Sequence, residues 1–200
     1  MNEVETSAWW TILGDGVRYC LAQVARGLAA ILLVPVLAAT AGLSIVGLGM
    51  IFVPAELRLV RWLADGERRA GARWVGNLEL AGSHAGKPWQ DMLSSRHTGY
   101  DLRWVVIAMV VCPTLGFLGL GLLLWPLVNV LLMALWWLVD PDDPIRLLGL
   151  FQLDSWGSAV GYGLPVLAVA FVLAALGPPA VAKCAARINQ RLLAGSRPTP

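Results

Sequence analysis

The chain has 200 residues, of which 58% are hydrophobic and 14% are charged, and its formal net charge is +2. Soluble domains are usually about 45–50% apolar and about 25% charged, so the composition argues against a soluble globular protein and favours an integral membrane protein. The basic residues are interleaved with acidic ones, so nucleic-acid binding is not expected.

The first predicted membrane element is a hairpin over about residues 18–62. No charge lies between Arg26 and Glu56. One crossing needs about 20 residues and two need about 40, so residues 27–55 could also form a single tilted helix. Small residues around Ala41 favour a bend there, which would place Arg26 and Glu56 at a similar depth on neighbouring helices. We therefore predict an ion pair between these two side chains.

A short internal repeat favours the hairpin over the single helix. Val34-Pro35 resembles Cys112-Pro113, and the boundary at Pro54 resembles the boundary at Pro179. Two copies of one hairpin would leave the ends of both copies on one side of the membrane. The predicted fold is an all-α integral membrane protein with four transmembrane helices as two repeated hairpins, forming a single domain over residues 1–200.

A cytoplasmic segment is predicted over residues 63–103. Of the 15 Lys and Arg residues, eight lie between Glu56 and Arg103 and four follow Ala182. Positive charge marks cytoplasmic loops, so the N- and C-termini are both expected in the cytoplasm. A helix leaving the membrane after Leu57 would place its arginines near anionic headgroups. These arginines are Arg58, Arg61, Arg68, Arg69 and Arg73.

No metal site or cofactor is expected. The only histidines, His84 and His97, have no Cys or carboxylate at ligand spacing, and the three cysteines share no such spacing.

The second hairpin is predicted over about residues 104–182. Its first crossing is uncharged from Trp104 to Val139, and Pro113 and Pro126 could kink it. Gly116, Gly119 and Gly121 would permit close contact with another helix. Asn129 is the notable polar residue of this crossing, and we expect it to form an interhelical hydrogen bond.

The loop between these two crossings is the candidate sensing loop. Four carboxylates could bind a cation or a basic peptide, or they could be solvated groups that keep the loop outside. The candidate residues are Asp140, Asp142, Asp143, Arg146, Asp154 and Trp156.

A cytoplasmic exit helix is predicted over residues 183–195. The sequence Gly177-Pro178-Pro179 should break or bend the chain just before it. Lys183, Arg187 and Arg191 have i, i+4, i+8 spacing and share one helix face. Pro179 and these three basic residues are the candidate signal-exit residues.

Several short stretches between about Val17 and Gly195 occur in the same order as the motifs of a known family. They are Gly42-Leu43-Ser44, Glu67-Arg68-Arg69, Asp101-Leu102-Arg103-Trp104, Leu150 to Trp156, and Leu192-Leu193-Ala194-Gly195. In these stretches the chain resembles the sensor domain at the N-terminus of many actinobacterial two-component histidine kinases. The resemblance implies a four-helix membrane domain, both termini in the cytoplasm, and a dimerisation and kinase region after the exit helix. It also leads us to expect a homodimer, whereas it carries over no sensing residue.

The function that we expect is signal input at the plasma membrane, with the lipid bilayer and a cytoplasmic kinase region or partner protein as contacts. The chain itself has no phosphoacceptor His context and no nucleotide-binding Gly motif, so we do not expect an enzyme. A small transporter or channel subunit is an alternative, although the centres of the segments contain no ionisable residue. A membrane enzyme or haem protein is a further alternative, although both histidines lie outside the predicted crossings.

Overall fold

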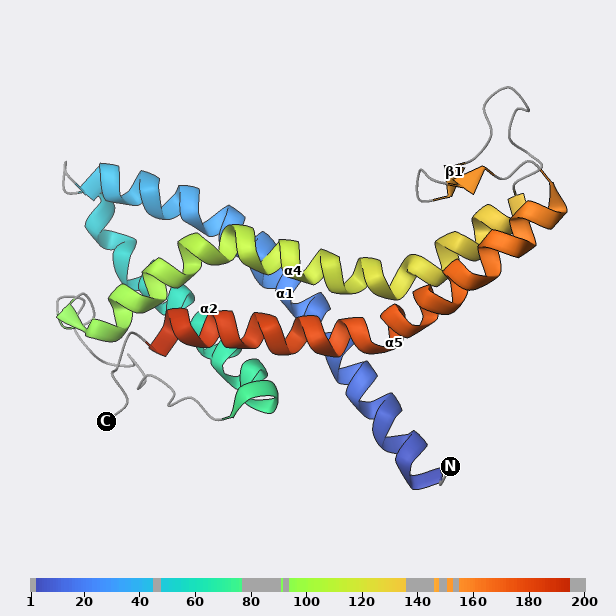
Figure 1. Ribbon diagram of the computed structural model, residues 1–200. Coiled ribbons are helices and arrows are strands. Elements are labelled where there is room, and N and C mark those ends of the chain that lie inside the picture. The colour runs from blue at the N-terminus through green and yellow to red at the C-terminus, as the bar shows by residue number, and fades with distance from the viewer. Residues whose placement is uncertain are drawn as a thin grey trace. The chain divides into compact units, whose positions relative to one another are not determined.

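Helices form nearly all of the described structure. The computed structural model describes residues 3–44, 48–76, 91, 94–135, 146–147, 151–152 and 155–194. Its elements are α1 (Glu3–Ser44), the 3-10 turn η1 (Leu48–Ile51), α2 (Val53–Val75), α4 (Arg96–Leu135), β1 (Arg146–Leu147), β2 (Phe151–Gln152) and α5 (Trp156–Ala194) (Figure 1). The two short strands pair antiparallel, with Arg146 opposite Gln152. The predicted helical class is therefore confirmed.

The helices differ in how well they could cross a membrane. Within the described residues, three helical segments are long and apolar enough to do so: Trp9–Ser44, His97–Leu135 and Trp156–Leu193. These segments support a membrane protein. Helix α2 is not among them, because it contains charged side chains from Glu56 to Arg73. The predicted count of four crossings is thus not confirmed.

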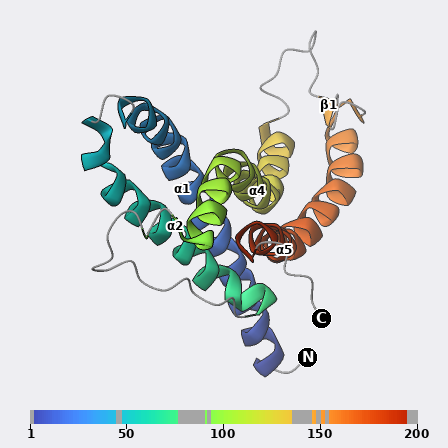
Figure 2. The ribbon, with the colours of Figure 1, turned by 90° about the vertical axis from the view of Figure 1, so that its left-hand side faces the viewer.

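The chain turns back between α1 and α2, so residues 27–55 do not form one helix. Helix α1 continues past Ala41 to Ser44, and α2 continues past Trp62 to Val75. The predicted bend near Ala41 is therefore wrong, because the helical hydrogen bonds of α1 extend further. The helix predicted to follow Leu57 is confirmed as part of α2. Thr40 of α1 donates a hydrogen bond of 2.5 Å to Glu56 of α2, and Figure 2 shows the two helices side by side.

Proline and glycine delimit α2. Pro54 lies in the first turn, where its missing N–H costs no helical hydrogen bond. Gly76 follows the last turn with φ of 97°, and its N–H donates to the carbonyl of Ala72 at 3.0 Å. This left-handed conformation is easy only for glycine, so it fixes where α2 ends.

The chain divides into two compact units, and each is described by itself. The larger unit contains Arg18–Phe117 and Val181–Pro200, and the smaller unit contains Met1–Val17 and Leu118–Ala180.

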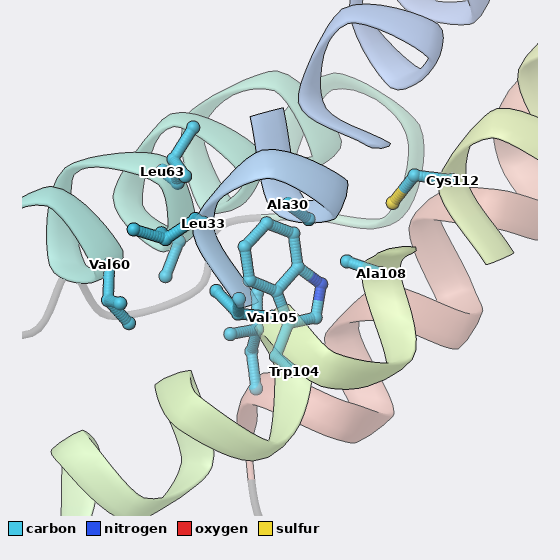
Figure 3. Close-up of a cluster of buried hydrophobic side chains, with 10 residues drawn as sticks. Ala30, Leu33, Val60, Leu63, Trp104, Val105, Ala108 and Cys112 are labelled. Carbon is cyan, nitrogen blue, oxygen red and sulfur yellow. The ribbon is translucent and has the colours of Figure 1, made fainter. Parts of the chain in front are cut away.

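Trp104 of α4 lies in the apolar core of the larger unit. Only 1% of its surface is exposed. Figure 3 shows its indole ring beside Ala30 of α1 and Ala108 of α4. Burial of a large side chain contributes on the order of 1.5–3 kcal/mol, so this cluster joins the helices that supply it. Its buried members are Ala30, Leu33, Val60, Leu63, Ala64, Trp104, Val105, Ala108, Cys112 and Leu193.

A second cluster packs the exit part of α5 against α1. Tyr19 is buried together with Ala182, Ala185 and Ala186. The Tyr19 ring also meets Trp74 of α2 edge-on, with ring centroids 6.3 Å apart. Small alanines allow α5 to approach closely, so the last helix is part of this core rather than a free extension.

Glycine permits the close approach of α1 and α4. A Cβ atom at Gly27 would lie 2.3 Å from Cδ of Pro113, and a Cβ atom at Gly116 would lie 2.6 Å from Cγ2 of Val24. Neither position has space for a side chain. The close helix contact expected at Gly116 is therefore confirmed.

In the smaller unit, α4 packs against α5 in the same way. A Cβ atom at Gly163 would lie 2.6 Å from the sulfur of Met133, and one at Gly177 would lie 2.7 Å from Cδ1 of Leu122. An apolar groove of about 460 Å³ also lies in this unit, and its lining includes Trp9, Trp10, Leu127, Val130 and Phe171.

Helix α5 is continuous through its prolines. It runs from Trp156 to Ala194 with Pro165, Pro178 and Pro179 inside it. Of the two expectations at Gly177-Pro178-Pro179, the break is therefore wrong, and the bend stays a prediction. Pro178 is buried and Gly177 packs against Leu122, so neighbouring side chains support the helix where proline removes hydrogen bonds.

Replacing Gly27 by Ala should destabilise the larger unit. Because the new methyl group would overlap the Pro113 ring, we expect a loss of about 1–3 kcal/mol in the free energy of unfolding, measured in mixed micelles. Gly42→Ala in the same helix is the matched control, since a Cβ atom there meets nothing within 4 Å. The control should be neutral or stabilising by about 0.5–1 kcal/mol. Equal effects of the two substitutions would contradict the close contact.

Candidate functional site

Helix α2 presents side chains of opposite charge on the two edges of its buried face. Successive residues in a helix are about 100° apart, so Leu57, Val60, Ala64 and Gly71 form one buried stripe. The same spacing places Glu67 at one edge of this stripe and Arg61 and Arg68 at the other edge, and all three are buried.

The Glu67 carboxylate accepts hydrogen bonds from two other helices. Its donors in α1 are the Tyr19 hydroxyl, the Gln23 amide at 2.9 Å and Nη1 of Arg26 at 2.6 Å. Its donor in α5 is Nδ2 of Asn189 at 2.9 Å. Glu67 is only 1% exposed, so these donors replace the water that a charged carboxylate would otherwise bind.

Asn189 connects the exit part of α5 to two more helices. Its amide nitrogen donates to Glu67 of α2, and its amide oxygen accepts a hydrogen bond of 3.0 Å from Nε1 of Trp104 in α4. Asn189 and Trp104 are each 1% exposed. One buried side chain thus fixes the position of α5 relative to α2 and α4.

The Asp101 carboxylate of α4 forms the second centre. Nε of Arg61 lies 2.7 Å from one of its oxygens, and Nη2 of Arg68 lies 2.7 Å from the other. Arg68 also pairs with Asp65 at 2.7 Å, and Nη2 of Arg61 donates to the hydroxyl of Thr98 at 3.4 Å. Both arginines reach across from α2, so Asp101 holds the start of α4 against that helix.

Together these groups form what we call the buried polar network. Its positive and negative charges are equal in number. The positive members are Arg26, Arg61 and Arg68, and the negative members are Asp65, Glu67 and Asp101. Its uncharged members are Tyr19, Gln23, Trp104, Asn189 and Thr98. Removing one partner of a buried pair typically costs about 3–5 kcal/mol, because the other charge is left unpaired. The network can therefore hold the four helices in one arrangement.

The groups of the network hold the helices together through hydrogen bonds and ion pairs. Its carboxylates accept hydrogen bonds from guanidinium, amide and hydroxyl groups. Among the residues that the structure describes, no group of three or more His, Cys, Asp or Glu could hold a metal ion.

The predicted pair between Arg26 and Glu56 is wrong. Arg26 pairs with Glu67, and Glu56 accepts its hydrogen bond from Thr40. The reason is the later turn of the chain. Because α2 begins at Val53, Glu56 lies beside the end of α1, and Glu67 is the residue that reaches the level of Arg26.

Two other expectations concern polar side chains. Asn129 donates to the carbonyl of Trp125 at 2.8 Å, so the hydrogen bond that the structure gives this side chain lies within α4, and an interhelical bond stays a prediction. Arg61 and Arg68 pair with Asp101 inside the protein and do not face headgroups, whereas Arg58 and Arg69 are exposed.

The candidate sensing loop is largely untested. Asp140, Asp142, Asp143 and Asp154 lie outside the described residues. Arg146 lies in β1, and Trp156 begins α5 with 61% of its surface exposed. A ligand at this loop stays a prediction.

The candidate exit residues lie along α5. Lys183, Arg187 and Arg191 are exposed on one face, as their spacing predicts, while Asn189 and Leu193 are buried on the opposite face. Pro179 lies inside the helix, where a Cβ atom at Gly16 of α1 would approach its nitrogen to 2.9 Å. The basic face is thus the outer face of the helix that the network holds.

Sequence reasoning missed most of the network. Glu67-Arg68 and Asp101 to Trp104 belong to the family motifs in the sequence, but no sequence pattern predicts that the side chains of the two motifs contact each other. One signal was present: Tyr19, Gln23 and Arg26 have i, i+4, i+7 spacing and form a polar stripe on an otherwise apolar helix.

Comparison with known proteins identifies a family. The family model described as "Putative sensor" matches residues 19–193, which is most of the chain. No curated protein and no solved structure matches the chain. The matched range begins at Tyr19 and ends at Leu193, so it contains every member of the buried polar network.

A double-mutant cycle should distinguish the two possible partners of Arg26. Arg26→Gln combined with Glu67→Gln should show a coupling energy of about 1–3 kcal/mol in unfolding, because the two side chains share one buried contact. Arg26→Gln combined with Glu56→Gln is the matched control and should be additive within about 0.5 kcal/mol. Coupling to Glu56 in place of Glu67 would contradict the structure.

Proposed function

The chain belongs to the "Putative sensor" family, and from this premise we propose that it is a membrane-embedded signal-input module that acts on a cytoplasmic output such as a histidine kinase. The kinase region would follow the exit helix or belong to a partner protein. The module itself would perform no catalysis, and its homodimer would bring two exit helices together.

The observation that carries this proposal is the position of Asn189. It lies in the last helix, it is buried, and it is hydrogen-bonded to Glu67 of α2 and receives a hydrogen bond from Trp104 of α4. Gln23 and Arg26 of α1 bind the same carboxylate. The exit helix therefore shares a single buried carboxylate with α1, so a shift of one helix changes the contacts of the other.

The proposed signal is a shift between two packings of these helices. A stimulus can change an equilibrium only through different contacts in its two states. A movement of α1 or α4 would change the donors available to Glu67 and Asn189, and α5 would rotate or slide to restore them. The exposed basic face of α5, with Lys183, Arg187 and Arg191, would move with it.

We also propose a topology with both termini in the cytoplasm. Helices α1 and α2 would form one hairpin and α4 and α5 another, each beginning and ending on the cytoplasmic side. The concentration of Lys and Arg after Glu56 and after Ala182 supports this orientation. A fourth complete crossing would take the charges of α2 through lipid. The first hairpin would therefore enter the bilayer mainly through α1 and the apolar turn at η1.

Fusion of a cytoplasmic reporter kinase after Ala194 tests the proposal. Each Ala residue inserted at the junction rotates the kinase by about 100° relative to α5, so output should rise and fall with a period of about 3.6 insertions. A Gly-Ser-Gly insertion, which interrupts the helix, is the control and should abolish the periodicity. Output that is indifferent to the number of Ala residues would argue against transmission through this helix. A fusion exported from the cytoplasm would contradict the topology.

A further inference from the structure

Four of the five arginines of α2 form two sets. Arg61 and Arg68 are buried and pair with Asp101. Arg58 and Arg69 are exposed, and in the part of the chain that the structure describes neither has an ion-pair partner. The second set is therefore available to an external ligand.

Arg58 and Arg69 share their helix face with a large aromatic side chain. Trp62 lies between them along the helix axis, and the helical repeat places it within about 40° of each in projection. Trp62 is 65% exposed, and Leu59 beside it is 45% exposed. We call Arg58, Trp62 and Arg69 the outward stripe of α2.

The surroundings of the outward stripe favour an anionic ligand with an apolar part. The nearest acidic side chain on α2, Asp65, is already paired with Arg68 at 2.7 Å. Just before α2, Ile51 and Phe52 are 78% and 58% exposed. The surface thus combines unpaired guanidinium groups with exposed apolar side chains.

Phospholipid headgroups fit this combination of groups. Guanidinium groups bind phosphate through two parallel hydrogen bonds, and tryptophan is enriched where membrane meets water. Basic residues next to a membrane segment attract anionic headgroups, with about 1 kcal/mol for each Lys or Arg near the surface. The chain's three long apolar helices already place it in a bilayer that supplies such lipid.

We propose that the outward stripe of α2 is a binding surface for anionic phospholipid at the cytoplasmic leaflet. Arg58 and Arg69 bind lipid phosphates, and the Trp62 ring lies at the level of the headgroups between them. Glu67, Arg61 and Arg68 of the buried polar network lie at the edges of the buried face of α2, away from this surface. Asp65 is the network member of α2 that lies beside the stripe, and it pairs with Arg68. Substitutions in the stripe should consequently leave the fold intact.

Lipid retention by the purified full chain tests the proposal. The chain in neutral detergent is titrated with phosphatidylglycerol or with phosphatidylcholine, and the bound lipid is counted by native mass spectrometry at low salt. One basic residue near an anionic surface contributes about fivefold to binding, so R58Q/R69Q should bind phosphatidylglycerol about 25-fold more weakly. Phosphatidylcholine binding should change less than twofold.

The matched control is R187Q/R191Q, which removes two exposed charges from α5. It should weaken phosphatidylglycerol binding less than threefold. Equal losses in both variants would show bulk electrostatic attraction, and no loss in R58Q/R69Q would show that the stripe does not bind lipid; either result overturns the proposal.

Two further experiments distinguish a lipid from a soluble anion and test the position of Trp62. Millimolar glycerol phosphate should fail to displace the lipid, and complete displacement would indicate a site for soluble anions and overturn the proposal. With brominated phosphatidylglycerol, the tryptophan emission that Trp62→Phe removes should be quenched. A Trp62 contribution that resists quenching would contradict its position at the headgroups.

Discussion

A carboxylate buried among helices constrains everything around it, because its charge must be matched by donors with fixed positions. Glu67 is such a group, with donors from α1 and α5 around it. Moving any of these helices by more than a fraction of a hydrogen-bond length would leave part of the charge unsatisfied. The contacts of Glu67 therefore determine where the exit helix can lie.

The second constraint is that α2 must be charged and yet buried. A helix with this many ionic side chains would ordinarily lie in water, but its apolar stripe packs in the core with Trp104. The charges are matched at the edges of the stripe, where Asp101 and Asp65 neutralise Arg61 and Arg68. Glu67 is neutralised there by Arg26. Buried ion pairs add little net stability compared with apolar packing, so we assign them a role in register and orientation.

The sequence allowed the long apolar helices, the close contact at Gly116 and the exposed basic face of the exit helix to be predicted, because each depends on local composition or helical spacing. It did not allow the partner of Arg26 to be predicted, because that depends on where the chain turns. Because the chain turns beyond Ser44 and not near Ala41, Arg26 pairs with Glu67 and not with Glu56. Asn189 could not be assigned either, since its partners lie far away in the chain and become neighbours only in the fold.

The central claim is that Asn189 holds the exit part of α5 in place. Hydrogen exchange of the backbone amides of residues 182–193 measures this directly, in the full chain in a bilayer, for Asn189→Leu and for Asn129→Leu. Both substitutions replace a buried Asn by a side chain of similar size. Asn189 bonds to α2 and α4, whereas the hydrogen bond that the described structure gives Asn129 stays within α4. We expect Asn189→Leu to speed exchange in this segment about tenfold or more and Asn129→Leu to leave it unchanged. Unchanged protection in Asn189→Leu would contradict it.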